Sequence, residues 1–200
     1  MMENKKYIKK ESRILGVDDS PFNKFKDKEC LVIATVFRGG NYMDGLLSTK
    51  VRVDGQNSTK KLIQIIKKTK HMGQLQCIMI NGIALAGFNV IDIHQLNKKT
   101  KLPVIIIIRK KPNFKKIKKA LKKADKKNWK KKLKLMEKAG KIYRLKSKNK
   151  NLYFQIAGVE EKRAKEIIKI SATHAIIPEP LRISHLIASG VVLGESRGRA

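Results

Sequence analysis

Acidic residues are scarce in this chain. Its 200 residues include 47 Lys and Arg but only 16 Asp and Glu, so the formal net charge is +31. This imbalance favours a polyanionic partner, most simply a nucleic acid. A second explanation stays open, because most of the basic residues are Lys, and such a bias can reflect an A/T-rich genome or a thermophilic source.

Cysteine and long apolar runs are also scarce. Cys30 and Cys77 have neither CxxC nor zinc-ligand spacing, which indicates two reduced, packed thiols in a cytosolic protein. The longest apolar run, Val104 to Ile108, is far too short to span a membrane. The charged residues 1–12 contain no apolar core of a signal peptide. We therefore expect a cytoplasmic protein without a membrane partner.

The chain length suits one domain over residues 1–200, with residues 1–12 as a flexible N-terminus. Residues 109–150 have a different composition from the rest. They contain 21 Lys and Arg against Asp125 and Glu137, a net charge of +19. Apolar side chains at helical spacing predict two amphipathic helices there, so we expect a basic helical segment inserted in the domain.

The remaining pattern alternates between strands and helices. Strands are predicted at residues 14–17, 30–37, 43–53, 75–80, 102–108 and 152–156, and helices after residue 57 and at 90–96, 160–171 and 181–189, before a tail at 190–200. A meander followed by strand–helix units predicts a mixed α/β sheet with helices on its faces. This order is similar to that of ribonuclease-H-like nucleases.

Asp18 is the most informative acidic residue. It follows the apolar strand at 14–17, and open α/β sheets place functional groups at such strand ends. A carboxylate inside a cationic protein can hold Mg²⁺ while the basic surface holds a phosphate backbone. The alternative is that Asp18 only begins a turn with Ser20 and Pro21.

Two further strand ends carry oxygen ligands. Asp54 follows the third predicted strand and Asn81 the fourth, and both could meet Asp18 if the three strands run parallel. Such hard ligands suit Mg²⁺ or Mn²⁺. The alternative for both is a plain turn, because each precedes a glycine.

The sequence contains few motifs that point to any other kind of catalysis. The chain has no phosphate-binding loop and no dinucleotide fingerprint, so we expect no nucleotide cofactor. His185 lies on the last predicted helix, where a packed or surface role is the alternative to a functional one.

Several segments together resemble a known family. The segments that carry the resemblance are residues 16–22, 35–40, 83–92, 102–112 and 178–200. Through them the chain is similar to the archaeal endonuclease dU family, which is itself similar in fold to endonuclease V, a Mg²⁺-dependent repair nuclease that nicks near deaminated bases.

The resemblance implies roles for single residues. Asp18 matches the metal-binding aspartate on the first strand of endonuclease V, and Asp54 lies where its second acidic ligand would lie. Asn81 stands where endonuclease V has an aspartate, so a neutral ligand replaces a charged one. His185 would assist as a proton-transfer group near the metal.

The predicted function is therefore a Mg²⁺- or Mn²⁺-dependent endonuclease acting on DNA with deoxyuridine or another deaminated base. Catalysis is assigned to Asp18, Asp54 and His185, and metal binding to Asp18, Asp54 and Asn81. Basic residues expected to position phosphates are Arg38, Arg109, Lys110, Lys111, Arg182, Arg197 and Arg199. The alternative is a non-catalytic nucleic-acid-binding protein that uses its basic helices. The oligomeric state stays open.

Overall fold

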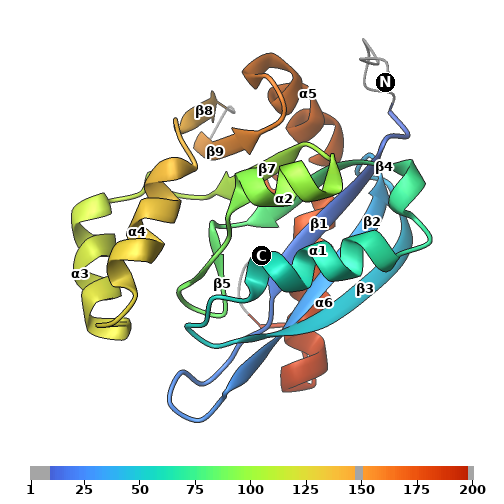
Figure 1. The fold of residues 1–200 in the computed structure, drawn as a ribbon. Helices are drawn as coiled ribbons and strands as arrows, with labels where there is room; N and C mark the ends of the chain where they lie inside the picture. The colour runs from blue at the N-terminus through green and yellow to red at the C-terminus, as the bar shows by residue number, and fades with distance from the viewer. Residues whose placement is uncertain (1–9, 147–150, 198–200) are drawn as a thin grey trace.

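A computed structural model describes residues 10–146 and 151–197 (Figure 1). The expected flexible N-terminus, residues 1–12, therefore lies mostly outside the described residues. Lys10 and Glu11 form an exposed turn, whereas Ser12 is already buried beside the first strand.

A mixed seven-stranded sheet forms the centre of the molecule, with strand order β3-β2-β1-β4-β7-β9-β8. Its strands are β1 (Arg13–Asp19), β2 (Glu29–Arg38), β3 (Tyr42–Arg52), β4 (Leu75–Asn81), β7 (Val104–Ile108), β8 (Tyr143–Lys146) and β9 (Asn151–Ala157). Strands β1, β4 and β7 are parallel to one another, and the other pairs are antiparallel. The predicted mixed α/β class is confirmed.

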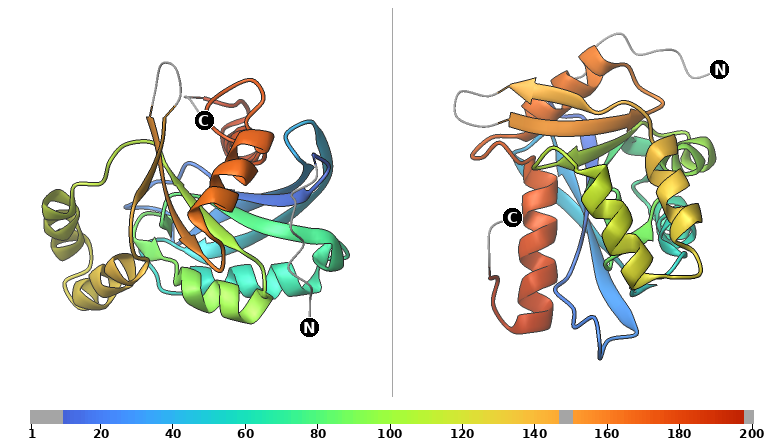
Figure 2. Two further views of the ribbon diagram at one scale, coloured as in Figure 1. Left: turned by 90° about the horizontal axis from the view of Figure 1, so that it is seen from above. Right: turned by 90° about the vertical axis from the view of Figure 1, so that its left-hand side faces the viewer.

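Helices cover both faces of the sheet, as Figure 2 shows from above. One face packs on α1 (Ser58–Lys68) and α2 (Ile93–Thr100), and the other on α5 (Glu161–Ser171) and α6 (Glu179–Leu193). Because side chains alternate along a strand, the continuous apolar runs supply both faces. In β7, for example, Ile106 joins the first core and Ile105 the second.

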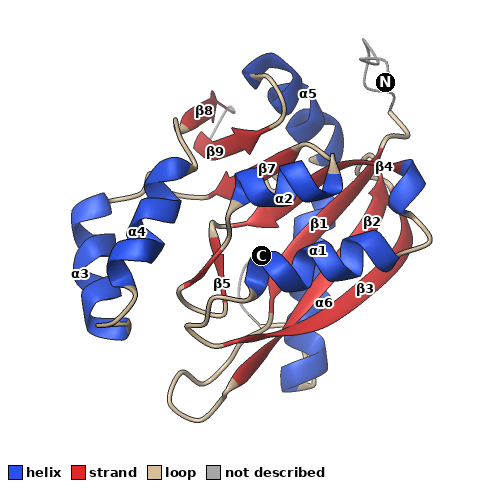
Figure 3. Ribbon diagram, viewed as in Figure 1, coloured by secondary structure: helices blue, strands red, loops and turns tan. Residues whose placement is uncertain are grey.

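Several helices and strands, which Figure 3 distinguishes by colour, differ from the prediction. The last helix extends through Leu193, so residues 190–193 are helical and not part of a tail; Gly194 ends it in the left-handed conformation with φ +79°. The predicted helix at 90–96 begins later, because the Asp92 side chain accepts a hydrogen bond from the Gln95 amide and caps α2. Short strands β5 (Ala84–Leu85) and β6 (Asn89–Val90) form a hairpin before it.

The basic segment is only partly helical. It contains α3 (Phe114–Ala124) and α4 (Trp129–Lys138), which lie together beside the sheet in Figure 1, and it then enters strand β8. The sequence prediction missed β8 because four residues with alternating polar side chains give a weak strand signal. The last part of the segment, residues 147–150, lies outside the described residues. Whether residues 1–200 act as one domain stays a prediction.

The two cysteines are buried and form no disulfide with each other, as expected for packed thiols. Burial raises the pKa of the Cys30 thiol to about 11. In the part of the chain that the structure covers, no helix is both long and apolar enough to cross a membrane.

Candidate active site

Asp18 is a buried carboxylate near the end of β1, with only 3% of its surface exposed. Its Oδ2 accepts hydrogen bonds from Nδ2 of Asn81 at 3.0 Å and from Nδ1 of His185 at 3.0 Å. Its Oδ1 accepts the amide of Asp19 at 3.0 Å. The sheet topology explains the first contact, because β1 and β4 are parallel neighbours and end at the same edge.

His185 reaches Asp18 because α6 lies directly on β1. A Cβ at Gly16 would overlap the main chain of Pro180, so only glycine permits this close approach. The Ser184 hydroxyl donates to the Gly16 carbonyl at 2.8 Å, and the Thr35 hydroxyl donates to the Pro180 carbonyl at 2.8 Å. Buried hydrogen bonds thus fix the first turns of the helix that carries His185.

The charges at this site act on one another. The hydrogen bond to Asp18 raises the pKa of His185, so the imidazolium form is favoured beside the carboxylate. Nε2 of His185 is buried and has no hydrogen-bond partner among the described residues. Burial, together with the neighbouring charge of Asp18, raises the pKa of Asp19 to about 6. The Asp19 carboxylate accepts the Ala86 amide at 2.8 Å, which ties the site to the β5–β6 hairpin.

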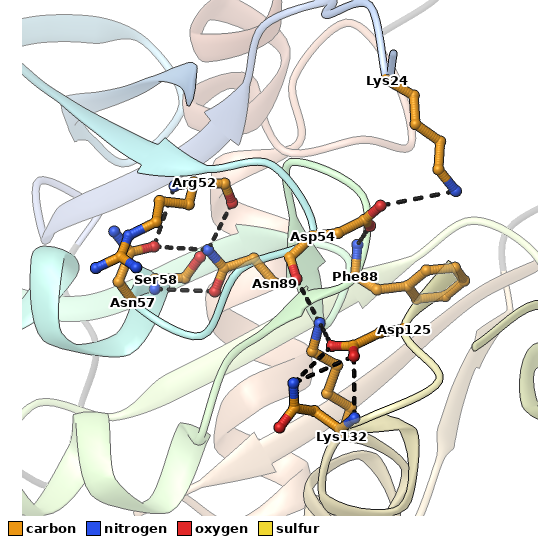
Figure 4. Close-up of polar contacts among 10 residues, drawn as sticks. Lys24, Arg52, Asp54, Asn57, Ser58, Phe88, Asn89, Asp125 and Lys132 are labelled. Atoms are coloured by element: carbon orange, nitrogen blue, oxygen red, sulfur yellow. Dashed lines mark hydrogen bonds and ion pairs between the residues drawn. The ribbon is translucent and has the colours of Figure 1, made fainter. Parts of the chain in front are cut away.

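Asp54 lies at the same edge of the sheet but has other partners (Figure 4). Its Oδ1 accepts the Phe88 amide at 2.8 Å, and its Oδ2 lies 3.6 Å from Nζ of Lys24. Its own amide donates to the Ala86 carbonyl at 2.8 Å. The tip of the β5–β6 hairpin therefore bridges Asp19 and Asp54, and Ala86 and Asp54 both have positive φ, of +48° and +50°. Such conformations in non-glycine residues are strained and concentrate at functional sites.

Lys132 connects the basic helices to this edge. Its side chain is only 1% exposed, and its Nζ donates to the Asp54 carbonyl at 2.5 Å and lies 2.8 Å from Asp125 Oδ2. Figure 4 shows Lys132 between these two partners. The other twelve lysines between residues 114 and 138 are exposed. A buried lysine requires paired charge and hydrogen bonds, so Lys132 fixes α4 against the Asp54 turn.

Asn89 holds the same turn from the opposite side. Its Nδ2 donates to the Arg52 carbonyl at 2.9 Å and to Asn57 Oδ1 at 2.7 Å, while its Oδ1 accepts the Ser58 amide at 3.0 Å. Figure 4 shows this buried amide joining β6 to the end of β3 and the start of α1. The route of the chain through Asp54 is thereby fixed.

The predicted metal ligands are brought together only in part. Asp18 and Asn81 are in contact, whereas the carboxylate contacts of Asp54 are with Lys24 and Phe88. Across residues 10–146 and 151–197, no three His, Cys, Asp or Glu side chains form a metal-binding group. The donor chemistry still fits Mg²⁺, which is commonly held by one or two carboxylates, waters and substrate phosphates.

The predicted phosphate-binding residues separate into two groups. Arg109, Lys110 and Lys111 follow β7, which ends at the same edge as β1 and β4, so they lie close to the candidate site. Arg38 lies at the opposite edge, because it pairs with Arg13 whereas Asp18 pairs with Ile33. Five residues of strand separate the two positions by about 17 Å.

Three arginines of the predicted phosphate-binding set form ion pairs with acidic residues. Arg38 contacts Asp44 at 2.8 Å, Arg182 contacts Glu179 at 2.7 Å, and Arg197 contacts Glu195 at 2.6 Å. Arg182 lies on α6 one turn before His185, near the site. Arg199 lies outside the described residues.

Sequence reasoning missed the residues that position the site. Gly16, Thr35 and Ser184 hold α6 on β1, and no local pattern distinguishes them from ordinary residues of a strand or helix. Lys132 stands among many other lysines in the sequence. Its helical spacing from Trp129 and Met136 places it on the apolar face of α4, and this spacing was a signal of its burial.

A mixed sheet of this order with helices on both faces is a ribonuclease-H-like fold. The family model described as endonuclease dU matches residues 10–192. This chain belongs to the endonuclease dU family. A relative from Methanothermobacter thermautotrophicus, named UPF0215 protein, is 48% identical over 201 residues, covering 100% of this chain and 98% of its own length.

Two solved structures show the same fold. A protein of unknown function from Archaeoglobus fulgidus superposes with a TM-score of 0.81 at 37% identity, covering 90% of this chain and 97% of its own. Endonuclease V from Ciona intestinalis, in complex with a 24mer DNA containing an inosine, superposes with a TM-score of 0.53 at 15% identity, covering 86% and 82%. The predicted family and the predicted fold class are both confirmed.

Proposed function

We propose that this protein is a metal-dependent endonuclease that cuts DNA at deoxyuridine or another deaminated base. The observation that carries the proposal is the buried Asp18 carboxylate, which Asn81 and His185 contact from two distant parts of the chain. A buried carboxylate costs stability unless it is paired and hydrogen-bonded, and here an imidazole and an amide supply those contacts. Family membership and the shared fold support nuclease chemistry.

Each residue of the candidate site has a proposed role. Asp18 and the amide oxygen of Asn81 would hold Mg²⁺ or Mn²⁺, with Asp54 contributing from the neighbouring turn. The ion would stabilise negative charge on the phosphodiester and help to generate hydroxide. His185 would donate a hydrogen bond from Nδ1 to Asp18, which orients the ring, and would take part in proton transfer near the metal. Arg109, Lys110 and Lys111 would bind the flanking phosphates.

The proposal is tested with a labelled duplex that carries one deoxyuridine, beside inosine-containing and undamaged duplexes, with and without Mg²⁺. We expect lesion-dependent nicking that requires the metal and is lost in Asp18→Ala. Asp44→Asn is the matched control, because Asp44 is also a partly buried, paired carboxylate but lies at the opposite edge of the sheet. Full activity in Asp18→Ala would contradict the proposal.

A second candidate is a nucleic-acid-binding protein without catalysis. It is favoured by the twelve exposed lysines of residues 114–138 and by the neutral Asn81 at a metal position. This candidate requires metal-independent binding with a steep salt dependence and no cleavage of any of the three duplexes.

A further inference from the structure

Phe25 is the most exposed large apolar side chain among the described residues, with 94% of its surface accessible. It lies at the tip of the loop between β1 and β2, residues 20–28. This loop projects beyond the sheet at the bottom of Figure 1 and again in the right-hand view of Figure 2. Phe22 of the same loop packs against the core, so the loop presents one aromatic ring to the protein and one to solvent.

The loop holds Phe25 in a defined position. Oδ1 of Asn23 accepts the amides of Phe25 at 2.9 Å and Lys26 at 3.2 Å. The Asn23 amide donates to Asp27 Oδ2 at 2.6 Å, and the Asp27 amide donates back to the Asn23 carbonyl at 2.8 Å. These hydrogen bonds fix the main chain that carries the exposed ring, so little main-chain entropy remains to be lost when a partner binds.

The turn also lies at the candidate site. It follows Asp19 directly in the chain, and Nζ of Lys24 lies 3.6 Å from Oδ2 of Asp54. Lys24, Lys26 and Lys28 are exposed in the same loop as the ring, whereas Asp27 is used within the turn itself. A ring with flanking ammonium groups is complementary to a nucleobase with its phosphates, and base–aromatic stacking tolerates any base.

We propose that Phe25 stacks on a nucleobase of the DNA strand held at the Asp18 site. This inference rests on the proposed function and extends it to substrate recognition. An unstacked base beside the cut is the partner that fits, because a base inside an intact duplex has no free face for the ring.

The test measures binding in EDTA, where no cleavage occurs, to a deoxyuridine duplex with 2-aminopurine beside the lesion. We expect Phe25→Ala to weaken binding about 5- to 150-fold, the range for loss of one stacked base. The salt dependence should stay unchanged, because no charge is removed. The rise in 2-aminopurine fluorescence on binding, which reports unstacking, should be lost. Phe25→Trp should restore both signals.

Tyr42→Ala is the matched control. Tyr42 is 62% exposed but is the first residue of β3, at the opposite edge of the sheet, so its removal should leave binding and fluorescence at wild-type values. Thermal unfolding of each variant checks folding. Wild-type affinity and fluorescence in Phe25→Ala would overturn the proposal, as would equal losses in Phe25→Ala and Tyr42→Ala.

The two proposals fail separately. Binding and fluorescence that depend on Phe25, with no nicking on addition of Mg²⁺, would reject the endonuclease and keep the stacking contact. Lesion-dependent nicking with wild-type binding in Phe25→Ala would reject stacking and keep the endonuclease. Loss of affinity for a single-stranded oligonucleotide in Phe25→Ala would also support stacking, because its bases are already free.

Discussion

Asp18 and Asp54 are two aspartates at one edge of one sheet, yet their surroundings differ. Asp18 is contacted by side chains from β4 and α6, and its ion-pair partner is the imidazole of His185. Asp54 is held by main-chain groups of a hairpin and by Lys24 and Lys132. The Asp18 carboxylate is paired with a titratable imidazole, whereas the Asp54 carboxylate is paired with the ammonium group of Lys24. We therefore propose that Asp18 carries the chemistry and that Asp54 shapes the approach to it.

The sharpest test of this comparison is a pair of equivalent substitutions. Asp18→Asn should lower the nicking rate by more than about 100-fold, because even residues that only support a metal ligand cost 10- to 100-fold. Asp54→Asn should cost less, since its amide can still accept the Phe88 hydrogen bond. Single-turnover nicking at saturating Mg²⁺ measures both. An equal or larger loss in Asp54→Asn would reverse the assignment.

Lys132→Met should destabilise the turn that carries Asp54. The substitution leaves the Asp54 carbonyl and the Asp125 carboxylate without their buried partner, and we expect a loss of about 2 kcal/mol in the free energy of unfolding. Lys134→Met is the control, because Lys134 is exposed on the same helix and should change stability by less than about 0.5 kcal/mol. Denaturant unfolding measures the free energy of unfolding of both variants. Equal stability would show that the contacts of Lys132 do not stabilise the fold.

Asn81→Asp tests whether position 81 binds the metal together with Asp18. A second carboxylate beside Asp18 should strengthen Mg²⁺ binding, and we expect the half-saturating Mg²⁺ concentration for nicking to fall by about tenfold. In EDTA the same variant should be less stable than the wild type, because two carboxylates then face each other. A metal titration of nicking, together with unfolding with and without Mg²⁺, measures the two effects. An unchanged titration would remove Asn81 from the metal site.

The smallest effect is expected at the opposite edge. Hydrogen bonds from Arg38 and Arg13 lower the pKa of Asp44 to about 2. Because the folded-state pKa is below that of the unfolded chain, near 4, this carboxylate stabilises the fold above about pH 4 and loses that contribution as the pH falls toward 2. The stability difference between wild type and Asp44→Asn should therefore shrink on acidification, and nicking at pH 7 should not change. A difference that is constant with pH would exclude the ion pair.

The sheet was predictable because its signals are local. The apolar runs that became β1, β4 and β7 are long and β-branched enough to identify strands, and their parallel order follows from the helices between them. The ends of those runs placed Asp18 and Asn81 at one edge, and the structure brings the two side chains into contact.

The contacts of loops were not predictable in the same way. The partners of Asp54 come from a hairpin tip and from a helix 78 residues away, and a sequence pattern carries no information on such pairs. The same holds for His185, whose distance from Asp18 depends on the absence of a side chain at Gly16. The basic segment was correctly read as two helices, but the one buried lysine among thirteen could be found only from its packing.

The packing of α6 on β1 has a consequence for the order in which the site is completed during translation. Asp18 and His185 are separated by 167 residues, so a ribosome that adds about 5 to 20 residues per second makes the aspartate roughly 10 to 30 s before the histidine. A nascent chain that ends before residue 179 would have the sheet edge without its helix, and the groove over Gly16 would be open to water. The contact between Asp18 and His185 is therefore completed late, after most of the sheet has been made.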